Sequence, residues 1–180
     1  MRHPKLLLPD QAALVIVDMQ EAFRPAIAEF DAIARRIAIV AQGAQLLRVP
    51  ILITEQSPKK LGRTSKEVQA VSPMEKTAFS CCGAPGFLEQ LQGRGAKQIL
   101  LCGIEAHVCV SQTAHDLLAA GLQVHLLTDC ISSRNARDKA IGLQKMLQSG
   151  AIPSSVEMAL FELMQDARHE QFRAIQKLIK

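Results

Sequence analysis

The chain has neither tryptophan nor tyrosine, and its six phenylalanines leave aromatic residues at 3% of the 180 positions. Proteins that bind single-stranded nucleic acids stack the bases on aromatic side chains, which are scarce here. The excess of basic residues is also small, 21 Lys+Arg against 17 Asp+Glu, and no run of basic residues concentrates it. We therefore expect no nucleic-acid partner.

Long apolar runs are missing as well, since no stretch approaches the roughly 18 apolar residues of a membrane-spanning helix. Near the N-terminus three leucines are followed at once by Pro9 and Asp10, which is too short an apolar region for a signal peptide. The five cysteines include the vicinal pair Cys81 and Cys82 but no CxxC pair and no zinc pattern. We expect a cytoplasmic protein with reduced thiols and no membrane contact.

Short apolar runs alternate with segments of helical periodicity. The runs are typical of strands buried on both faces, and they cover residues 12–18, 50–55, 97–104 and 123–129. The periodic segments predict helices over residues 30–49, 85–95, 108–121, 135–150, 154–165 and 169–180. This alternation indicates right-handed crossovers and a mainly parallel sheet between two layers of helices. With no internal repeat or linker, we expect one domain over residues 1–180.

Chemically reactive side chains follow the predicted strands, where parallel sheets bind ligands. Asp18 ends the first run. The stretch "GIEAHVCV" (103–110) follows the third run and places Glu105, His107 and Cys109 near the start of a helix, whose N–H groups and dipole favour a thiolate. Two interpretations fit both Cys109 and Asp18. Cys109 is a small buried thiol or a nucleophile, and Asp18 is a helix cap or the base that takes the thiol proton.

Three motifs resemble those of the isochorismatase-like cysteine hydrolases in their order and approximate spacing. They are "LVIVDMQEAF" (14–23), "EKTAFS" (75–80) and "GIEAHVCV" (103–110). The stretches "TEQSPKKLG" (54–62), "LTDCISSR" (127–134) and "MLQSGAIPSSVEMALFEL" (146–163) are similar to the isochorismatase-domain-containing subgroup. The resemblance covers nearly the whole chain. It implies a three-layer α/β/α, Rossmann-like fold with a six-stranded, mainly parallel sheet flanked by helices.

The resemblance also implies a catalytic triad of Asp18, Lys76 and Cys109, although Lys76 taken alone has the pattern of a solvated surface lysine. Asp18 would take the proton of Cys109, and Lys76 would favour the thiolate. The thiolate would attack a small amide or related carbonyl compound to form a thioester that water hydrolyses. Family members carry a cis peptide bond just before the position of Glu105, so the N–H groups of Glu105 and Cys109 would form an oxyanion hole.

Departures from the family pattern narrow the expected activity. Nicotinamidases of this family bind a metal through an aspartate and histidines after the second strand, whereas residues 54–62 contain no histidine. No glycine-rich nucleotide motif occurs either. We therefore expect no metal and no cofactor. The candidate substrate-pocket residues are Gln20, Phe23, Gln56, Phe79 and His107.

Three functions stay open for the thiol at Cys109. The leading hypothesis is a hydrolase of a small-molecule substrate, which requires Asp18 and Lys76. The alternatives are a catalytically weak or inactive protein that works by partner binding, and a redox sensor, which needs a second thiol within reach of Cys109. Relatives assemble through helices packed across subunits, so the resemblance implies a homo-oligomer.

Overall fold

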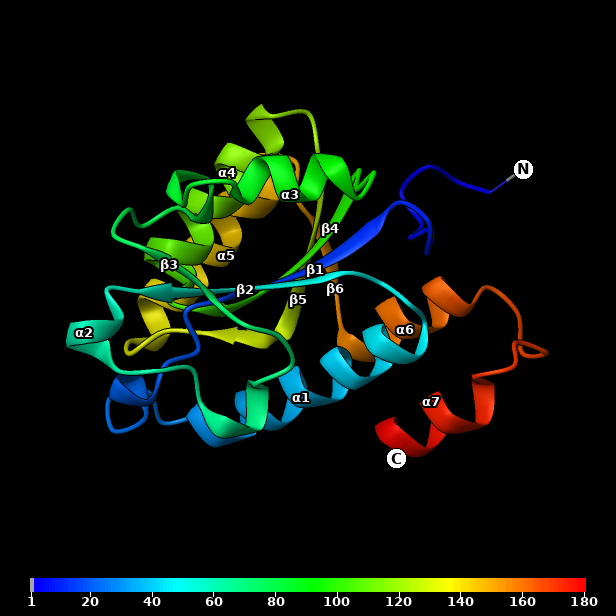
Figure 1. Ribbon diagram of the computed structural model, residues 1–180, viewed down its shortest axis with the longest axis horizontal. Helices are drawn as coiled ribbons and strands as arrows, with labels where there is room; N and C mark the ends of the chain where they lie inside the picture. The colour runs from blue at the N-terminus through cyan, green and yellow to red at the C-terminus, as the bar shows by residue number, and fades with distance from the viewer. Residues whose placement is uncertain (1) are drawn as a thin grey trace.

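The computed structural model describes residues 2–180 as a three-layer α/β/α structure around a six-stranded, all-parallel sheet (Figure 1). The strand order is β3-β2-β1-β4-β5-β6. The strands are β1 (Ala12–Val17), β2 (Ile51–Gln56), β3 (Met74–Lys76), β4 (Gln98–Ile104), β5 (Gln123–Ser132) and β6 (Ile152–Ser154). The helices are α1 (Phe30–Leu46), α2 (Pro58–Leu61), α3 (Phe87–Gly93), α4 (Ser111–Ala119), α5 (Ala136–Gln148), α6 (Val156–Met164) and α7 (Phe172–Ile179).

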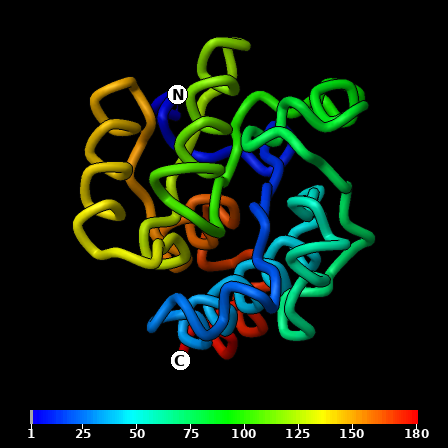
Figure 2. Tube along the Cα trace, turned by 90° about the vertical axis from the view of Figure 1, so that its left-hand side faces the viewer, coloured from blue at the N-terminus to red at the C-terminus, as the bar shows by residue number. Residues whose placement is uncertain are grey.

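Alternate residues of each central strand face opposite helical layers. In β1, Leu14 and Ile16 join the core formed with α1, α6 and α7, whereas Ala13 and Val15 join the core formed with α3, α4 and α5. Figures 1 and 2 show these two groups of helices on opposite faces of the sheet. Burial on both faces explains why the central strands read as continuous apolar runs. The predicted fold class is confirmed.

The residue pattern missed the two strands at the edges of the sheet. β3 and β6 span three residues each, which is too short for a periodic signal. β5 also runs further than the predicted end at residue 129, because its pairing with β4 shifts register between Leu101 and Gly103 and then resumes. No helix in the described part of the chain is long and apolar enough to cross a membrane.

Glycine is required at position 103, where β4 passes β1 very closely. Gly103 has φ +115°, and a Cβ atom there would lie 2.1 Å from the carbonyl oxygen of Val17. No other residue fits this combination of left-handed backbone and contact with a neighbouring strand. The close approach places the end of β4 directly beside the end of β1.

A buried cluster of amide side chains binds the N-terminal segment to the edge of the sheet where the strands begin. The side chain of Gln98 accepts from the Leu8 N–H (2.7 Å) and donates to Gln123 Oε1 (2.7 Å). His125 Nε2 donates to the same oxygen at 2.8 Å, since a carbonyl oxygen only accepts. The imidazole is 1% exposed, and burial lowers the pKa of His125 to about 4.

We predict that the protein loses stability between pH 6.5 and pH 4 because of His125. In this range the unfolded chain binds a proton at His125 that the folded chain excludes, so the free energy of unfolding falls as the pH falls. The contribution is about 3 kcal/mol. Urea unfolding of the wild type and of His125→Gln, which keeps an N–H donor but does not titrate, measures it. Equal pH slopes in both proteins would contradict the prediction.

Candidate active site

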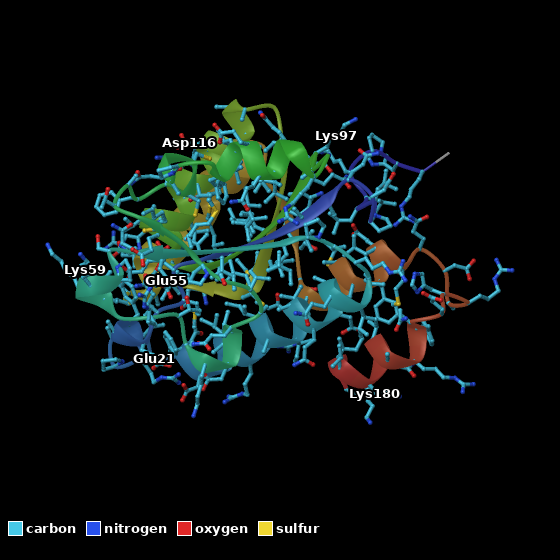
Figure 3. All side chains as sticks on the ribbon, in the orientation of Figure 1. Glu21, Glu55, Lys59, Lys97, Asp116 and Lys180 are labelled. Carbon is cyan, nitrogen blue, oxygen red and sulfur yellow. The ribbon has the colours of Figure 1, made fainter. Side chains whose placement is uncertain are left out.

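The candidate site lies at the carboxyl edge of the sheet, where the parallel strands end side by side. Asp18 follows β1, Lys76 ends β3, and Glu105 follows β4. Figure 3 marks this edge by Glu55 near the end of β2 and the opposite edge by Lys97 before β4. Asp18 has φ +48°, a left-handed conformation that aspartate tolerates better than most residues. The sharp turn directs the chain away from β1 directly after the carboxylate.

A buried ion pair joins Asp18 and Lys76. Lys76 Nζ lies 2.6 Å from Asp18 Oδ2, and both side chains are at most 1% exposed. The ammonium also donates to Gln56 Oε1 (2.9 Å) and to the carbonyl oxygens of Phe79 (2.9 Å) and Ala78 (3.2 Å). The lysine therefore anchors both the carboxylate and the loop that follows β3. The structure rejects the alternative of a solvated surface lysine.

The other carboxylate oxygen of Asp18 has its own donor. Thr54, on β2, donates from Oγ1 to Asp18 Oδ1 at 2.8 Å. The same hydroxyl lies 3.3 Å from the sulfur of Cys81, and both residues are completely buried. The sequence alone assigned no role to Thr54 or to Cys81. The available signal was a polar residue inside the apolar run of β2.

Cys109 is carried by a π-helical turn, Ala106–Val110, that precedes α4. A single turn of this kind displaces a helix locally and is frequent at functional sites. The thiol is 8% exposed. Burial raises the pKa of Cys109 to about 12, the Asp18 carboxylate raises it through its charge and direct contact, and the Lys76 ammonium acts in the opposite direction. The structure thus brings Asp18, Lys76 and Cys109 together.

The expectation of an activated thiolate at Cys109 is wrong for this resting state. It was based on the helix terminus and on the positive charge of Lys76. In the structure, burial penalises a further anion, and the Asp18 carboxylate that pairs with Lys76 raises the pKa of the thiol more than the Lys76 ammonium lowers it. Cys109 therefore rests as a neutral thiol beside a carboxylate that can accept its proton.

Glu105 links the ends of β4 and β5. The peptide bond between Ile104 and Glu105 is cis, as the family resemblance implied. The Glu105 carboxylate accepts from the backbone N–H of Arg134 (3.0 Å) and from its Nε (2.9 Å). Its carbonyl oxygen accepts from the N–H groups of Val108 and Val110, both at 3.1 Å. Glu105 consequently holds the turn that carries the thiol.

The five pocket candidates occupy different environments. Gln20 is buried, and its amide bonds to the backbone of Gln56 and Gly62, so it supports a loop rather than facing a ligand. Phe23 packs against the core on the α1 side. The side chain of Gln56 donates from Nε2 to the carbonyl oxygen of Thr77 (2.7 Å) and accepts at Oε1 from Lys76.

Phe79 and His107 remain at the surface of the site. Phe79 is 54% exposed, while its carbonyl oxygen is held by Lys76. His107 is half-buried, and its Nδ1 lies 3.0 Å from the Ser133 hydroxyl beyond β5. Among residues 2–180 no group of three His, Cys, Asp or Glu side chains is placed to hold a metal.

α5 presses against the turn that carries the thiol. A Cβ atom added at Gly142 would lie 2.9 Å from the carbonyl of Ala106 and from Cα of His107. Real Cβ atoms do not approach backbone this closely, so only glycine permits the observed packing. Gly142 therefore helps to set the position of the Cys109 turn.

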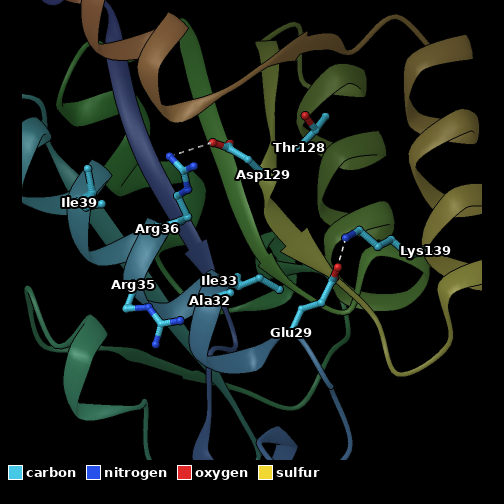
Figure 4. A pocket seen from close by; sticks show the side chains of 9 residues that line it. All are labelled: Glu29, Ala32, Ile33, Arg35, Arg36, Ile39, Thr128, Asp129 and Lys139. Carbon is cyan, nitrogen blue, oxygen red and sulfur yellow. Dashed lines mark hydrogen bonds and ion pairs between the residues drawn. The ribbon is translucent and has the colours of Figure 1, made fainter. Parts of the chain in front are cut away.

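Cys109 lines neither of two surface cavities of the protein. One, of about 620 Å³, lies beside α2 and the end of β3 and is lined by Lys59, Lys60 and Lys76 among others. The other, of about 490 Å³, lies between α1 and β5 (Figure 4). In Figure 4, Glu29 is paired with Lys139 at 2.7 Å, and Arg36 points toward Asp129.

The fold and site define a class: a doubly covered parallel sheet with an Asp–Lys pair and a thiol at its carboxyl edge. The family model described as the isochorismatase domain matches residues 12–158. The chain belongs to the isochorismatase family, whose members are generally hydrolases.

Curated relatives support the assignment. Isochorismatase domain-containing protein 2A of Mus musculus is 45% identical over 97% of this chain and 85% of its own length. Isochorismatase domain-containing protein 2 of Homo sapiens is 44% identical with the same coverage.

Solved structures show the same fold. A structure described as MAR1 ribonuclease from Caenorhabditis elegans has a TM-score of 0.92 and 36% identity, covering 97% of this chain and 92% of its own. The YcaC gene product of Escherichia coli, described as an octameric hydrolase of unknown specificity, has a TM-score of 0.91 at 20% identity, covering 99% of this chain and 91% of its own. At that identity the second comparison shows the fold alone.

We predict strong coupling between Asp18 and Lys76 in folding stability. Removing one partner leaves a buried charge unpaired, which costs about 3–5 kcal/mol. Asp18→Asn and Lys76→Met should each destabilise the protein to this extent, and the double variant should be far more stable than the sum of the two losses predicts. Urea unfolding of the four proteins measures the coupling. Simple additivity would contradict a direct ion pair.

We predict that Gly142→Ala displaces the Cys109 turn. Overpacking at this position should lower the free energy of unfolding by about 1–3 kcal/mol and change the rate at which iodoacetamide alkylates Cys109. Gly93→Ala in α3 is the matched control, because a Cβ there meets nothing within 4 Å. If both variants behave like the wild type, the close packing of α5 does not position the thiol.

Proposed function

We propose that the protein is a cysteine hydrolase that cleaves a small amide or related carbonyl compound through Asp18, Lys76 and Cys109. The observation that carries the proposal is the buried Asp18–Lys76 ion pair beside the Cys109 thiol. A charged pair is expensive to bury, and a proton-transfer role beside a thiol accounts for its presence.

The raised pKa of the Cys109 thiol implies deprotonation during attack rather than before it. Asp18 takes the S–H proton as the sulfur bonds to the carbonyl carbon. The tetrahedral intermediate collapses, Asp18 protonates the leaving amine, and a thioester remains on Cys109. Water then attacks the thioester while Asp18 accepts one of its protons. Asp18 returns this proton to the departing sulfur, which regenerates the Cys109 thiol and releases a carboxylic acid. Lys76 offsets the negative charge shared by the carboxylate and the sulfur.

The backbone at Glu105 and Cys109 would stabilise the oxyanion. Support comes from the Glu105 N–H, which has no backbone or side-chain acceptor among the residues that the structure describes. An unused donor next to the nucleophile is available to a developing negative charge. One well-aimed donor of this type is worth about 2.7–4 kcal/mol of barrier.

The setting of the reaction is also part of the proposal. All five cysteines are free thiols, which suits a reducing, cytoplasmic environment. We further propose a homo-oligomer. Exposed apolar side chains on α5 and α6, Ile141, Met158 and Phe161, support it, and the E. coli neighbour is described as octameric.

We predict that Cys109→Ala abolishes turnover. A panel of small amides and the activated ester p-nitrophenyl acetate should reveal hydrolysis by the wild type, and loss of the nucleophile should lower kcat by about 10³-fold or more. Intact-mass spectrometry should detect the acyl group on Cys109 of the wild type.

Cys82→Ala is the matched control for this experiment, because Cys82 is a half-buried thiol outside the triad. It should retain full activity. Turnover that survives in Cys109→Ala, or a panel in which no compound reacts, would refute the cysteine-hydrolase proposal.

RNA cleavage is the second candidate function, because the C. elegans neighbour at 36% identity is described as a ribonuclease. The low aromatic content and small net charge of this chain argue against it. Incubation of a labelled RNA with the wild type and Cys109→Ala separates the two functions. Cleavage that co-purifies with the protein and persists without the thiol would favour a ribonuclease.

A further inference from the structure

Thr54 contacts Asp18, the proposed base, through both its backbone and its side chain. Its carbonyl oxygen accepts from the Asp18 N–H at 3.2 Å, and its hydroxyl lies 2.8 Å from Asp18 Oδ1. Lys76 occupies the other carboxylate oxygen, Oδ2. The carboxylate of Asp18 is therefore held by one donor on each oxygen, which prevents it from rotating.

The direction of the hydrogen bonds around Thr54 follows from the number of hydrogens. A hydroxyl has one hydrogen, and an ionised carboxylate only accepts. Thr54 must therefore donate to Asp18, so the 3.3 Å contact with Cys81 requires the thiol to donate to Thr54. Burial raises the pKa of Cys81 to about 12, so the proton that this contact requires is present.

Cys81 is itself fixed to the helix that follows the nucleophile. Its backbone N–H donates to Thr113 Oγ1 at 2.9 Å, and Thr113 lies in α4, four residues after Cys109. A continuous set of buried contacts thus connects Asp18, Thr54, Cys81 and α4. It connects the proposed proton acceptor to the helix that follows the turn carrying the thiol.

We propose that Thr54 is a positioning residue that orients the Asp18 carboxylate toward the Cys109 thiol, with the thiol of Cys81 as its supporting donor. The proposal rests on the proposed function in so far as Asp18 is the base. A purely structural role for Thr54 would support folding without affecting proton transfer, and the two roles separate experimentally.

Thr54→Val removes the hydroxyl at nearly constant volume, and Thr54→Ser keeps it. A hydrogen bond to a charged group corresponds to roughly a 10–100-fold effect. With p-nitrophenyl acetate, Thr54→Val should lower kcat by this factor with KM little changed, and Thr54→Ser should restore most of the rate. Cys81→Ala should lower kcat less than Thr54→Val does, because it removes only the supporting donor. Cys81→Ser keeps a donor and should retain a higher kcat than Cys81→Ala.

Thr64→Val is the matched control. Thr64 is another buried threonine whose hydroxyl donates to a buried carboxylate, that of Glu55, at 2.8 Å, outside the triad. Its loss should lower the thermal midpoint of unfolding while leaving kcat near the wild-type value. An equal loss of kcat in both threonine variants would show that any buried hydroxyl near this edge has the same effect, and would overturn the assignment.

Alkylation of Cys109 by iodoacetamide, read by peptide mass spectrometry at neutral pH, tests positioning independently of hydrolysis. Thr54→Val should slow this reaction and Thr54→Ser should restore it. If the wild type hydrolyses nothing but the alkylation rates follow this order, the proposed function fails and the positioning role stands. The positioning role is wrong, whatever the hydrolase assay shows, if Cys109 of Thr54→Val is alkylated at the wild-type rate. It is also wrong if Cys109 is alkylated no faster in Thr54→Ser than in Thr54→Val.

Discussion

The buried ion pair between Asp18 and Lys76 is the interaction on which the rest of the site depends. Two charges removed from water are stable only when each is well bonded. Lys76 meets this requirement with the carbonyl oxygens of the loop after β3 and with Gln56, and Asp18 meets it with Thr54. The pair thereby ties three neighbouring strands and one loop to a single geometry.

The same pair influences the resting state of the Cys109 thiol. Because Asp18 is adjacent to the thiol and already charged, a second anion at Cys109 is disfavoured, and burial adds to this effect. A neutral thiol beside a base is less susceptible to oxidation than a permanently ionised thiol, because the thiolate is the reactive form. In the mechanism that we propose, this arrangement favours a nucleophile that forms only when a substrate carbonyl is present to receive the sulfur.

Sequence patterns predicted the central elements well and the peripheral ones poorly. β1 and β4 are buried on both faces, so their apolar runs are visible without any tertiary information. β3 and β6 have only three residues, and their strand state comes from pairing with β2 and β5. The helix expected from residue 108 begins instead with a π-helical turn, which the 3.6-residue period of the side chains does not reveal.

The amino-acid order indicated the layers of the fold through local periodicity, and the resemblance of its motifs to a known family pointed to Asp18, Lys76 and Cys109. Tertiary structure decided how these residues are arranged. Asp18 and Lys76 are 58 positions apart, and only the parallel strands bring their charges into contact. The direction of the shift in the Cys109 pKa, and the contacts of Thr54 and Cys81 behind the carboxylate, depend on burial and on neighbours from distant segments, which a linear pattern does not encode.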